Sequence, residues 1–545
     1  MNMKKQLILL CVIVLLGAVL RLYKLDTVPA INADEAALGY NAYALLKTGL
    51  DEHGNKWPLH FQSFNDFKPG LTVYAILPFI AAFGLNEWSV RLLPALIGIF
   101  TIVALYLLAK EMVREKTNKQ LAQYFPLLAA FLLSVSPWHI HFSRGAWEVN
   151  IATFFLVSGA YFFMRWRERS VYLLASCVVF VLSLYTYHAA RIITPLLVLV
   201  LVANDWKALL QSWKRVVSVG SIGFLLCLPL LFSLVSPAGL ARAGGVGLWS
   251  DSGPENRVNE LRGNYENTNG VIPRLLHNKP IGYTLAFLSN WAEHYWGEFL
   301  FLSGDDIQRN KVPETGQLHL IEIAFLGVGI LYAIRSKNKK WQTVFLWLLI
   351  APLPAALTFQ SPHALRSANM VIPLTLLSAY GLFIICTYFK SYTRAICVVM
   401  TLLIALSVGR YIHMYYSHMA KAFPFSSQYG VKELVTYLSP IHTQYQKVIV
   451  TDRYDQPYIL FLFYMKYDPA LFQKEHTLTA RDQYGFSTVR SFSNFSFESV
   501  PYEKMIQQYP NSLIVGTSQE ILPEANISQD IIGENGYRYF RVVVN

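Results

Sequence analysis

Long apolar runs recur through the first three quarters of this 545-residue chain, and they restrict its fold more than any other feature. A helix needs about 20 mostly apolar residues to cross a bilayer. Eleven runs approach that length, at residues 7–20, 91–109, 121–136, 149–164, 171–187, 192–203, 216–235, 317–334, 341–358, 370–389 and 395–412. Charged residues make up only 15% of the chain. These features predict a polytopic α-helical membrane protein with about eleven transmembrane helices and exclude disordered, collagen-like and disulfide-scaffold chains.

The distribution of basic residues favours one membrane topology. Sixteen Lys and Arg residues lie in five loops, at 110–119, 165–169, 207–215, 335–340 and 390–394. The short loops between them hold only Arg144, Arg191 and Arg366. Because cytoplasmic loops carry an excess of Lys and Arg, we expect the five loops and the N-terminus to be cytoplasmic. This topology, and not a nucleic-acid partner, explains the net charge of +12.

Two apolar segments need a separate interpretation. The run 7–20 follows Lys4 and Lys5 and has no small-residue cleavage site after it, so it predicts an uncleaved signal anchor. The run 71–84 is too short to span the bilayer. Counting it as a span would also place the basic loops on both sides of the membrane. We therefore expect it to form an interfacial or re-entrant helix on the outer side.

Three long segments then lie outside the membrane, at 21–90, 236–316 and 413–545. The last has short apolar runs at 448–450, 513–515 and 539–544, with helix-like stretches near 428–438 and 456–466. This pattern predicts a C-terminal extracytoplasmic α/β domain over 413–545. Residues 1–412 are predicted to form the transmembrane domain, with 21–90 and 236–316 as its external loops.

The first external loop contains candidates for a general base and for a phosphate-binding cation. Asn32, followed three residues later by Glu35, is typical of a capping box and predicts a helix from about 33 to 48 that stops at Gly49. Asp34 and Glu35 then lie in its first turn, where they complement the helix dipole or act as a general base. Lys68 precedes the interfacial helix, where it could snorkel or bind a lipid phosphate.

Similar polar clusters lie at the predicted outer ends of other spans. They contain Arg144 and Glu148, His188 and Arg191, Asp305 and Arg309, and His363 and Arg366. Each cluster alone could be solvated loop charge. Together they gather carboxylates, histidines and arginines at the outer interface, which indicates a functional site there. The five cysteines all lie inside apolar runs and show no metal-ligand spacing.

The order of these motifs resembles that of the C-type (GT-C) membrane glycosyltransferases. The residues concerned are Asp34-Glu35, Lys68-Pro69, Ser143-Arg144-Gly145 with Glu148, Ser303-Gly304-Asp305, and His363-Ala364-Leu365-Arg366. The nearest resemblance is to glycosyltransferase family 39, with the protein O-mannosyltransferases and the bacterial lipid A aminoarabinose transferase. It covers roughly residues 20–410. One departure is Gly70, which stands where the family often has a second proline after the lysine.

The resemblance implies transfer of a sugar from a polyprenyl-phosphate donor to a protein, lipid or cell-envelope glycan on the outer face, with inversion. It implies that Asp34 is the base with Glu35 beside it, that Glu148 is a second catalytic acid, and that Lys68 binds the lipid phosphate. Further candidates for the phosphate are Arg191, Arg309 and Arg366. Candidate substrate-binding residues are Tyr40, Arg144, His188, Asp305 and His363.

No organic cofactor is expected, because a lipid-linked sugar phosphate needs no nucleotide-binding loop. A metal-free site is favoured, with a divalent cation held by Asp34 and Glu148 as the alternative. The predicted location is the plasma membrane, with membrane lipids and the lipid-linked sugar as partners and no nucleic acid. A lipid or polysaccharide transporter would need a polar path through mid-membrane, whereas the predicted spans are mostly free of charge. A receptor or scaffold with a sensing domain is the third alternative.

Overall fold

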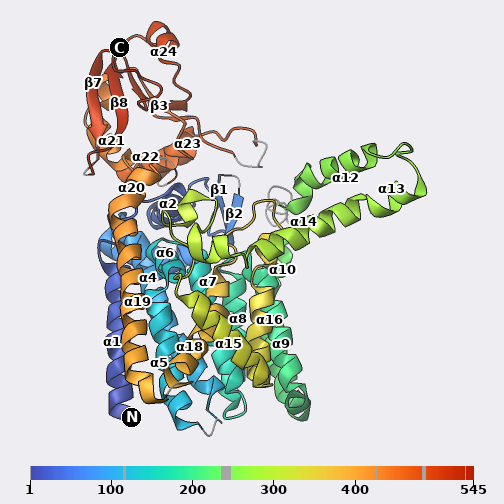
Figure 1. Ribbon diagram of the computed structural model, residues 1–545. Coiled ribbons are helices and arrows are strands. Elements are labelled where there is room, and N and C mark those ends of the chain that lie inside the picture. The colour runs from blue at the N-terminus through green and yellow to red at the C-terminus, as the bar shows by residue number, and fades with distance from the viewer. Residues whose placement is uncertain are drawn as a thin grey trace. The chain divides into compact units, whose positions relative to one another are not determined.

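The computed structural model describes residues 2–64, 66–114, 118–234, 247–388, 390–424, 426, 428–481, 487–533 and 535–545, without the side chains of 234 and 390 (Figure 1). These residues divide into two compact units. The helical unit comprises Met1–Leu20, Ile97–Phe142 and Glu148–Tyr411. The mixed unit comprises Arg21–Leu96, Ser143–Trp147 and Ile412–Asn545.

Each predicted span overlaps a helix, because an apolar segment in lipid must satisfy its backbone groups internally. The helices are α1 (Met3–Leu22), α4 (Glu87–Met112), α5 (Lys119–Val135), α7 (Glu148–Met164), α8 (Ser170–Leu184), α9 (Ala190–Gln211), α10 (Trp213–Leu234), α15 (Glu322–Arg335), α16 (Lys339–Ile350), α18 (Val371–Tyr388) and α19 (Thr393–His413). The last residues of two predicted spans, 235 and 389, lie outside the described part of the chain.

The number of eleven spans is not confirmed. Among the described residues, six helices are long and apolar enough to cross a membrane, or seven if α5 and α6 (Pro137–Arg144), bent by 56°, form one broken span. Helices α15 and α16 have only 14 and 12 residues. In α16 the cause is local, since Pro352 and Pro354 follow it and the chain re-forms as the short α17 (Leu353–Ala356).

Glycines allow close contact between α15 and α18. A Cβ atom on Gly381 would lie 1.8 Å from the Phe325 carbonyl oxygen, and one on Gly329 would lie 2.0 Å from the Leu377 carbonyl oxygen. The two backbones therefore touch at a small-residue contact of the kind that membrane helices favour.

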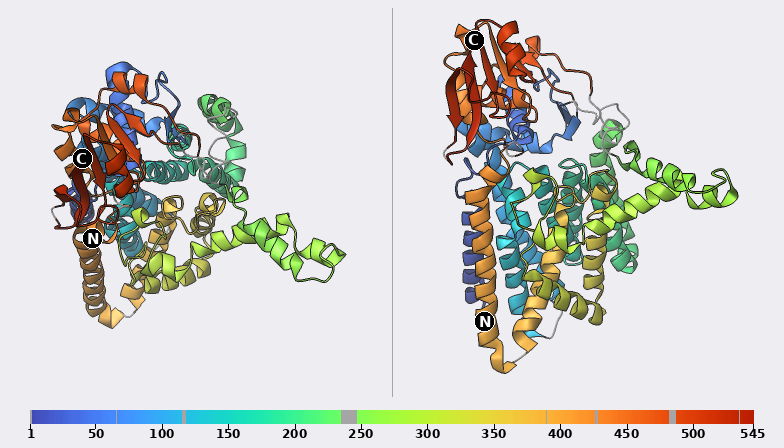
Figure 2. Two further views of the ribbon diagram at one scale, coloured as in Figure 1. Left: turned by 90° about the horizontal axis from the view of Figure 1, so that it is seen from above. Right: turned by 45° about the horizontal axis from the view of Figure 1, so that its top comes forward.

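Shorter elements connect the long helices of the helical unit. They are η1 (Leu248–Ser250), α12 (Gly253–Gly263), α13 (Val271–Leu276), α14 (Lys279–Glu293), η2 (Glu298–Leu302), η3 (Gln308–Asn310), η4 (Ala368–Met370) and η5 (Lys390–Tyr392). Helices α12–α14 form an arm that extends away from the long helices of this unit (Figures 1 and 2).

The C-terminal part of the mixed unit contains a six-stranded sheet in the order β4-β5-β3-β6-β8-β7. The strands are β3 (Lys447–Thr451), β4 (Ser491–Phe492), β5 (Phe495–Glu498), β6 (Ser512–Gly516), β7 (Ile527–Ile532) and β8 (Arg538–Val544). Strands β5, β3 and β6 are parallel, and the others join antiparallel. The helical elements are η6 (Met414–His418), α20 (Met419–Ala422), α21 (Val431–Leu438), η7 (His442–Gln444), α22 (Pro457–Met465), α23 (Pro469–Glu475) and α24 (Tyr502–Gln508).

Five of these elements coincide with the segments singled out in the sequence, namely β3, β6, β8, α21 and α22. Strand β6 is buried along its whole length, as expected of a strand covered on both faces. Strand β7 was not predicted, because it lies at the sheet edge and is mostly exposed and polar.

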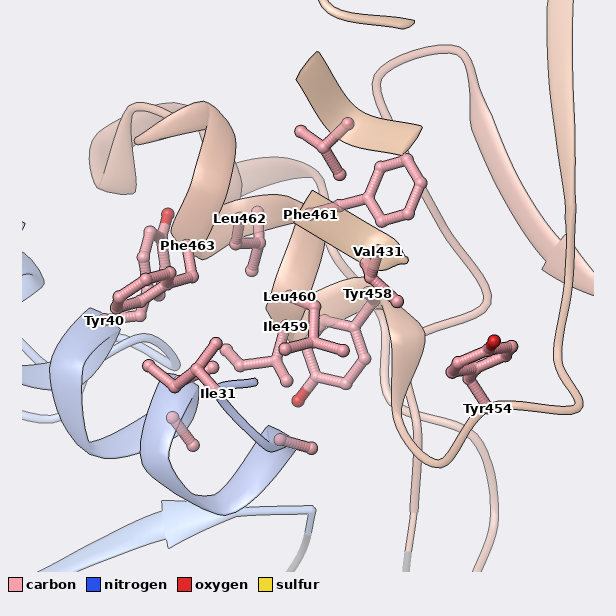
Figure 3. Close-up of a cluster of buried hydrophobic side chains, with 14 of the residues drawn as sticks. Ile31, Tyr40, Val431, Tyr454, Tyr458, Ile459, Leu460, Phe461, Leu462 and Phe463 are labelled. Carbon is pink, nitrogen blue, oxygen red and sulfur yellow. The ribbon is translucent and has the colours of Figure 1, made fainter. Parts of the chain in front are cut away.

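The first external loop shares a hydrophobic core with this C-terminal segment. The loop forms α2 (Ala33–Thr48), β1 (His60–Ser63), β2 (Asp66–Pro69) and the 13-residue α3 (Leu71–Phe83). Figure 3 shows Tyr40 of α2 beside Phe463 of α22, and Ile31 near Ile459. The predicted division instead placed 21–90 with the transmembrane helices. Helix α22 is apolar on all sides, so it must be covered by more than the sheet alone.

Candidate functional site

The start of α2 is fixed by the predicted capping box. The Glu35 backbone N–H donates to Asn32 Oδ1 at 3.1 Å, and Glu35 Oε2 accepts from the Asn32 backbone N–H at 3.2 Å. The Ala33 N–H donates to Gln428 Oε1 at 2.5 Å. Gly49 ends the helix in the left-handed conformation, with φ 74°. The prediction of a helix over 33–48 is confirmed, and the capping holds Asp34 and Glu35 in defined directions.

Asp34 and Lys68 form an ion pair in the mixed unit. Lys68 Nζ lies 2.5 Å from Asp34 Oδ1. The Asp34 side chain is 26% exposed and that of Lys68 is 10% exposed. Asp34 thus keeps access to a ligand within a helix that is otherwise buried along most of its length. The structure therefore brings together the two residues to which the resemblance gives the central roles.

A hairpin positions Lys68. Strands β1 and β2 pair antiparallel with Lys68 opposite Phe61, and the ammonium lies 5.5 Å from the Phe64 ring centroid. The Gly70 N–H then donates to the Leu59 carbonyl at 3.0 Å. Proline at position 70 could not make this bond, and a Cβ there would lie 2.9 Å from the same oxygen. The departure from the family pattern thus accompanies a backbone that holds Lys68 in place.

Glu35 has a different environment from its neighbour. Its side chain is 1% exposed and accepts from Arg91 Nε at 2.8 Å and Arg91 Nη2 at 2.6 Å. The Ala146 N–H donates to Glu35 Oε1 at 2.8 Å. Arg91 also donates to the carbonyls of Leu25, Pro29 and Ala30. Both carboxylate oxygens are therefore occupied, which favours a role in positioning the loop and leaves the role of base to Asp34.

Two predicted substrate-binding residues of the mixed unit lie in its interior. Arg144 is fully buried and donates to the carbonyls of Arg21, Lys24 and Val28, with Nε directed to the Tyr415 hydroxyl. The buried Tyr40 hydroxyl donates to the Tyr467 carbonyl at 3.1 Å, and burial raises its pKa. Neither side chain offers exposed surface to a ligand. Both stabilise the fold of the unit.

Asp305 and His363 lie together in the helical unit. His363 Nδ1 is 3.8 Å from Asp305 Oδ2, which accepts from the Ala364 N–H at 2.6 Å. The His363 N–H in turn donates to His294 Nε2 at 3.1 Å. Burial raises the pKa of Asp305 and lowers that of His294 to about 4. These buried contacts join the loops around 305 and 363 and indicate a structural role.

The remaining predicted residues of the helical unit are less buried, except Glu148. Arg191 Nη1 lies 3.1 Å from His188 Nδ1 at the start of α9. Arg366 donates to Thr358 Oγ1 at 2.6 Å, and Arg309 is half-buried. Glu148 is buried as the first residue of α7. The three arginines therefore remain candidate cations for a phosphate.

A row of buried polar side chains in contact with one another begins at Glu52 and was not predicted from the sequence. Asn41 Nδ2 donates to Glu52 Oε1 at 3.1 Å, and His53 Nε2 lies 3.7 Å from the same oxygen. His53 Nδ1 is 2.9 Å from His476 Nε2. Burial raises the pKa of Glu52 to about 8, and nearby Lys68 offsets part of the rise. The run Asp51-Glu52-His53, directly after the end of α2, is the sequence signal that could have pointed to it.

Within the described part of the chain, no group of three or more His, Cys, Asp or Glu side chains is arranged to hold a metal ion. Asp34 makes its ion pair with an ammonium group. A divalent cation at Asp34 and Glu148 therefore stays a prediction, as does a metal-free site.

Comparison with solved structures identifies proteins of the same fold. Two crystal structures of ArnT from Cupriavidus metallidurans, one bound to undecaprenyl phosphate and one in the apo state, match with TM-scores of 0.53 and 0.51. Each is 12% identical, and the matches cover 99% and 98% of this chain and 98% and 97% of the ArnT chains. Similarity at this identity shows the fold alone. The fold is therefore that of the two ArnT structures.

A second similarity, to a protein family, is found in the sequence of the N-terminal part of the chain. Residues 11–242 match the dolichyl-phosphate-mannose-protein mannosyltransferase family. No match was found among curated protein sequences. The predicted resemblance to the C-type glycosyltransferases, with family 39 as the relative, is therefore confirmed. Together with the candidate spans, it supports a multi-pass membrane protein. The plasma membrane and the side of each terminus stay predictions.

Proposed function

We propose that this protein transfers a sugar from a polyprenyl-phosphate-linked donor to an acceptor on the outer face of the membrane, with inversion at the anomeric carbon. The observation that carries the proposal is the 2.5 Å ion pair between Asp34, whose side chain is 26% exposed, and Lys68 in the mixed unit. The match to the mannosyltransferase family supports it. The ArnT structure with undecaprenyl phosphate supports a lipid-phosphate donor in particular.

The chemistry follows from the two charges. The acceptor hydroxyl attacks the anomeric carbon and transfers its proton to Asp34, while the bond from that carbon to the phosphate oxygen breaks. The departing lipid phosphate gains negative charge, which the Lys68 ammonium stabilises. When the donor arrives, its phosphate competes with Asp34 for Lys68. Donor binding thus weakens the ion pair and releases the carboxylate to act as base.

Other residues complete the proposal. Arg191, Arg309 and Arg366 are the further cations proposed for the phosphate, and Glu148 is the second acidic residue. His188 beside Arg191 is the remaining candidate for contact with the sugar. We assign Glu35, Arg144, Tyr40, Asp305 and His363 to positioning, because each is buried and bonded within the protein. The acceptor is a protein, a lipid or a cell-envelope glycan.

Steady-state kinetics of the full-length protein in nanodiscs test the proposal. The donor is undecaprenyl-phosphate-linked mannose, and glycan profiling of a deletion strain identifies the sugar to use if mannose is not transferred. Asp34→Asn should lower kcat by about 10²–10⁴ with little change in donor KM. Lys68→Ala should raise the donor KM and also lower kcat, and Lys68→Arg should recover part of the affinity.

A matched control comes from an ion pair elsewhere in the mixed unit. Lys432 Nζ lies 2.6 Å from Glu87 Oε1, and the lysine side chain is half-exposed. Lys432→Ala and Glu87→Gln remove one partner of that pair without touching the proposed site, so both should turn over at the wild-type rate. Wild-type kinetic constants in both Asp34→Asn and Lys68→Ala would refute the assignment.

A further inference from the structure

The arm formed by α12, α13 and α14 carries a large exposed apolar surface. On α13, Val271 is 81% exposed and Leu275 is 67% exposed. On α14, Ile281, Leu285 and Leu288 are exposed and spaced four and three residues apart, so they share one face of the helix. No residue of α14 is buried. An apolar surface of this extent marks an interaction site.

One side of α14 is already used by α12. Gly282 lies so close to α12 that a Cβ atom there would be 2.7 Å from Val258 Cγ2. Tyr283 donates to the Asp251 carbonyl at 3.0 Å, and Lys279 pairs with Glu255 at 2.7 Å. One side of α14 is therefore packed within the arm, and the face with Ile281, Leu285 and Leu288 is left for another partner.

The base of the arm is fixed to the ends of the long helices. Asn290 Nδ2 donates to the Thr358 carbonyl at 3.0 Å, and Trp291 Nε1 donates to the Leu349 carbonyl at 3.0 Å. The Tyr295 hydroxyl donates to the Leu348 carbonyl. From this base, α14 runs across the direction of the long helices and not along it (Figures 1 and 2). This direction carries α14 away from the bundle, over the region that lipid occupies around membrane-spanning helices.

The charge of the apolar stretch fits a phospholipid surface. Between residues 271 and 292 the only charged residues are Arg274 and Lys279, both basic. Exposed Trp249 and Trp296 flank the arm, and tryptophan is enriched at the headgroup level. Leucine on one face, lysine and arginine beside it and flanking tryptophan are typical of helices that lie in the membrane interface.

We propose that the α12–α14 arm lies on the bilayer surface, with the apolar face of α13 and α14 inserted among the lipid headgroups and upper acyl chains. The arm then anchors the segment 253–293 to lipid in addition to the transmembrane helices. This inference does not depend on the proposed enzymatic function.

Fluorescence quenching of the full-length protein in phosphatidylcholine–phosphatidylglycerol nanodiscs tests the proposal. Leu285→Cys, in a background with the five native cysteines replaced by alanine, is labelled with bimane. A matched label goes on Arg257→Cys of α12, whose side chain is 63% exposed. Lipids that carry a nitroxide near the headgroup should quench the label at 285 several-fold more than the label at 257, and its emission should shift to the blue.

Equal quenching at 285 and 257 would overturn the proposal, because the apolar face of α14 would then be no closer to lipid than α12 is. A blue shift without lipid quenching, together with a doubled particle mass, would overturn it in favour of a second copy of the chain. If the Leu285→Cys protein does not elute as a single species, Leu275→Cys gives an independent measurement on α13. Quenching at 275 equal to that at 257 would then overturn the proposal in the same way.

Discussion

The buried polar side chains from Glu52 to His476 allow a prediction of the protonation state of Glu52. His476 Nδ1 lies 2.7 Å from the Phe472 carbonyl, so this nitrogen carries a proton and His476 Nε2 is an acceptor. His53 must then donate through Nδ1, which leaves His53 Nε2 as an acceptor facing Glu52. Glu52 Oε2 and His53 Nε2 are buried without a hydrogen-bond partner. A proton on Glu52 suits this cluster, because it removes a buried charge and places a donor opposite the acceptor His53 Nε2, which lies 3.7 Å from Glu52 Oε1.

The expected size of the effect follows from the pKa of Glu52, which burial raises from 4.5 to about 8. The folded protein then keeps a proton that the unfolded chain releases above pH 4.5. The stabilisation from neutral Glu52 is therefore complete at low pH and is lost as pH rises towards 8. It falls by about 1.4 kcal/mol per pH unit within that window. The whole window of 3.5 pH units gives about 5 kcal/mol, and relaxation of the site at high pH makes this an upper bound for the total.

The other titratable groups around Glu52 make different contributions to the pH dependence of stability. Burial lowers the pKa of His53 to about 3, so its contribution is lost only as pH falls below about 6.5. Asp51 adjoins Glu52, and burial raises its pKa as well. Lys68 is the nearby cation, and Tyr40 and Tyr458 face the carboxyl group. A comparison of the wild type with a Glu52 variant cancels the contributions that these groups share.

The perturbation is Glu52→Gln, which keeps the shape and supplies an N–H donor towards His53 and an oxygen for Asn41. Melting temperatures of the full-length protein in nanodiscs are measured from pH 5 to pH 8. The variant should gain stability relative to the wild type as pH rises, most clearly above pH 7. Glu433→Gln, at an exposed glutamate of α21, serves as the control and should follow the wild type. Parallel curves for Glu52→Gln and wild type would refute the proton assignment.

Three further predictions concern the fold and the topology. Arg91→Met leaves the Glu35 carboxylate buried without its cation, so it should destabilise the protein by about 3–5 kcal/mol, measured by thermal unfolding, and Arg91→Lys should recover only part. Gly381→Leu should abolish the α15–α18 contact and the monodisperse elution of the purified protein, whereas Gly327→Leu, with open space around its Cβ, should elute normally. Cysteines at the exposed Lys56 and Ser493 should react with a membrane-impermeant thiol reagent in intact cells, and those at Lys119 and Lys339 should not. Labelling at 119 but not at 56 would invert the predicted topology.

The local features of the fold could be predicted from the sequence. Apolar runs gave the positions of the long helices, and Asn32, Glu35 and Gly49 gave both ends of α2. The lengths of α15 and α16 could not be predicted, because apolar residues precede the start of α15 and continue past the end of α16. The packing of α2 against α22 could not be predicted either, since more than 400 residues separate them in the chain. No local pattern reports which helix will cover another at that separation.

In the candidate site, the sequence alone also could not predict which of two adjacent carboxylates is the base. Asp34 and Glu35 are chemically alike and adjacent in sequence, so no composition or motif distinguishes them. Successive residues of an α-helix point about 100° apart, and here that rotation directs the buried Glu35 to Arg91 and the partly exposed Asp34 to Lys68. The arginine is a fixed partner, because it also bonds to three carbonyls of the loop, whereas the lysine is a flexible point charge that a phosphate can attract. The partner of each carboxylate, and not the carboxylate itself, therefore determines which one can be released to accept a proton.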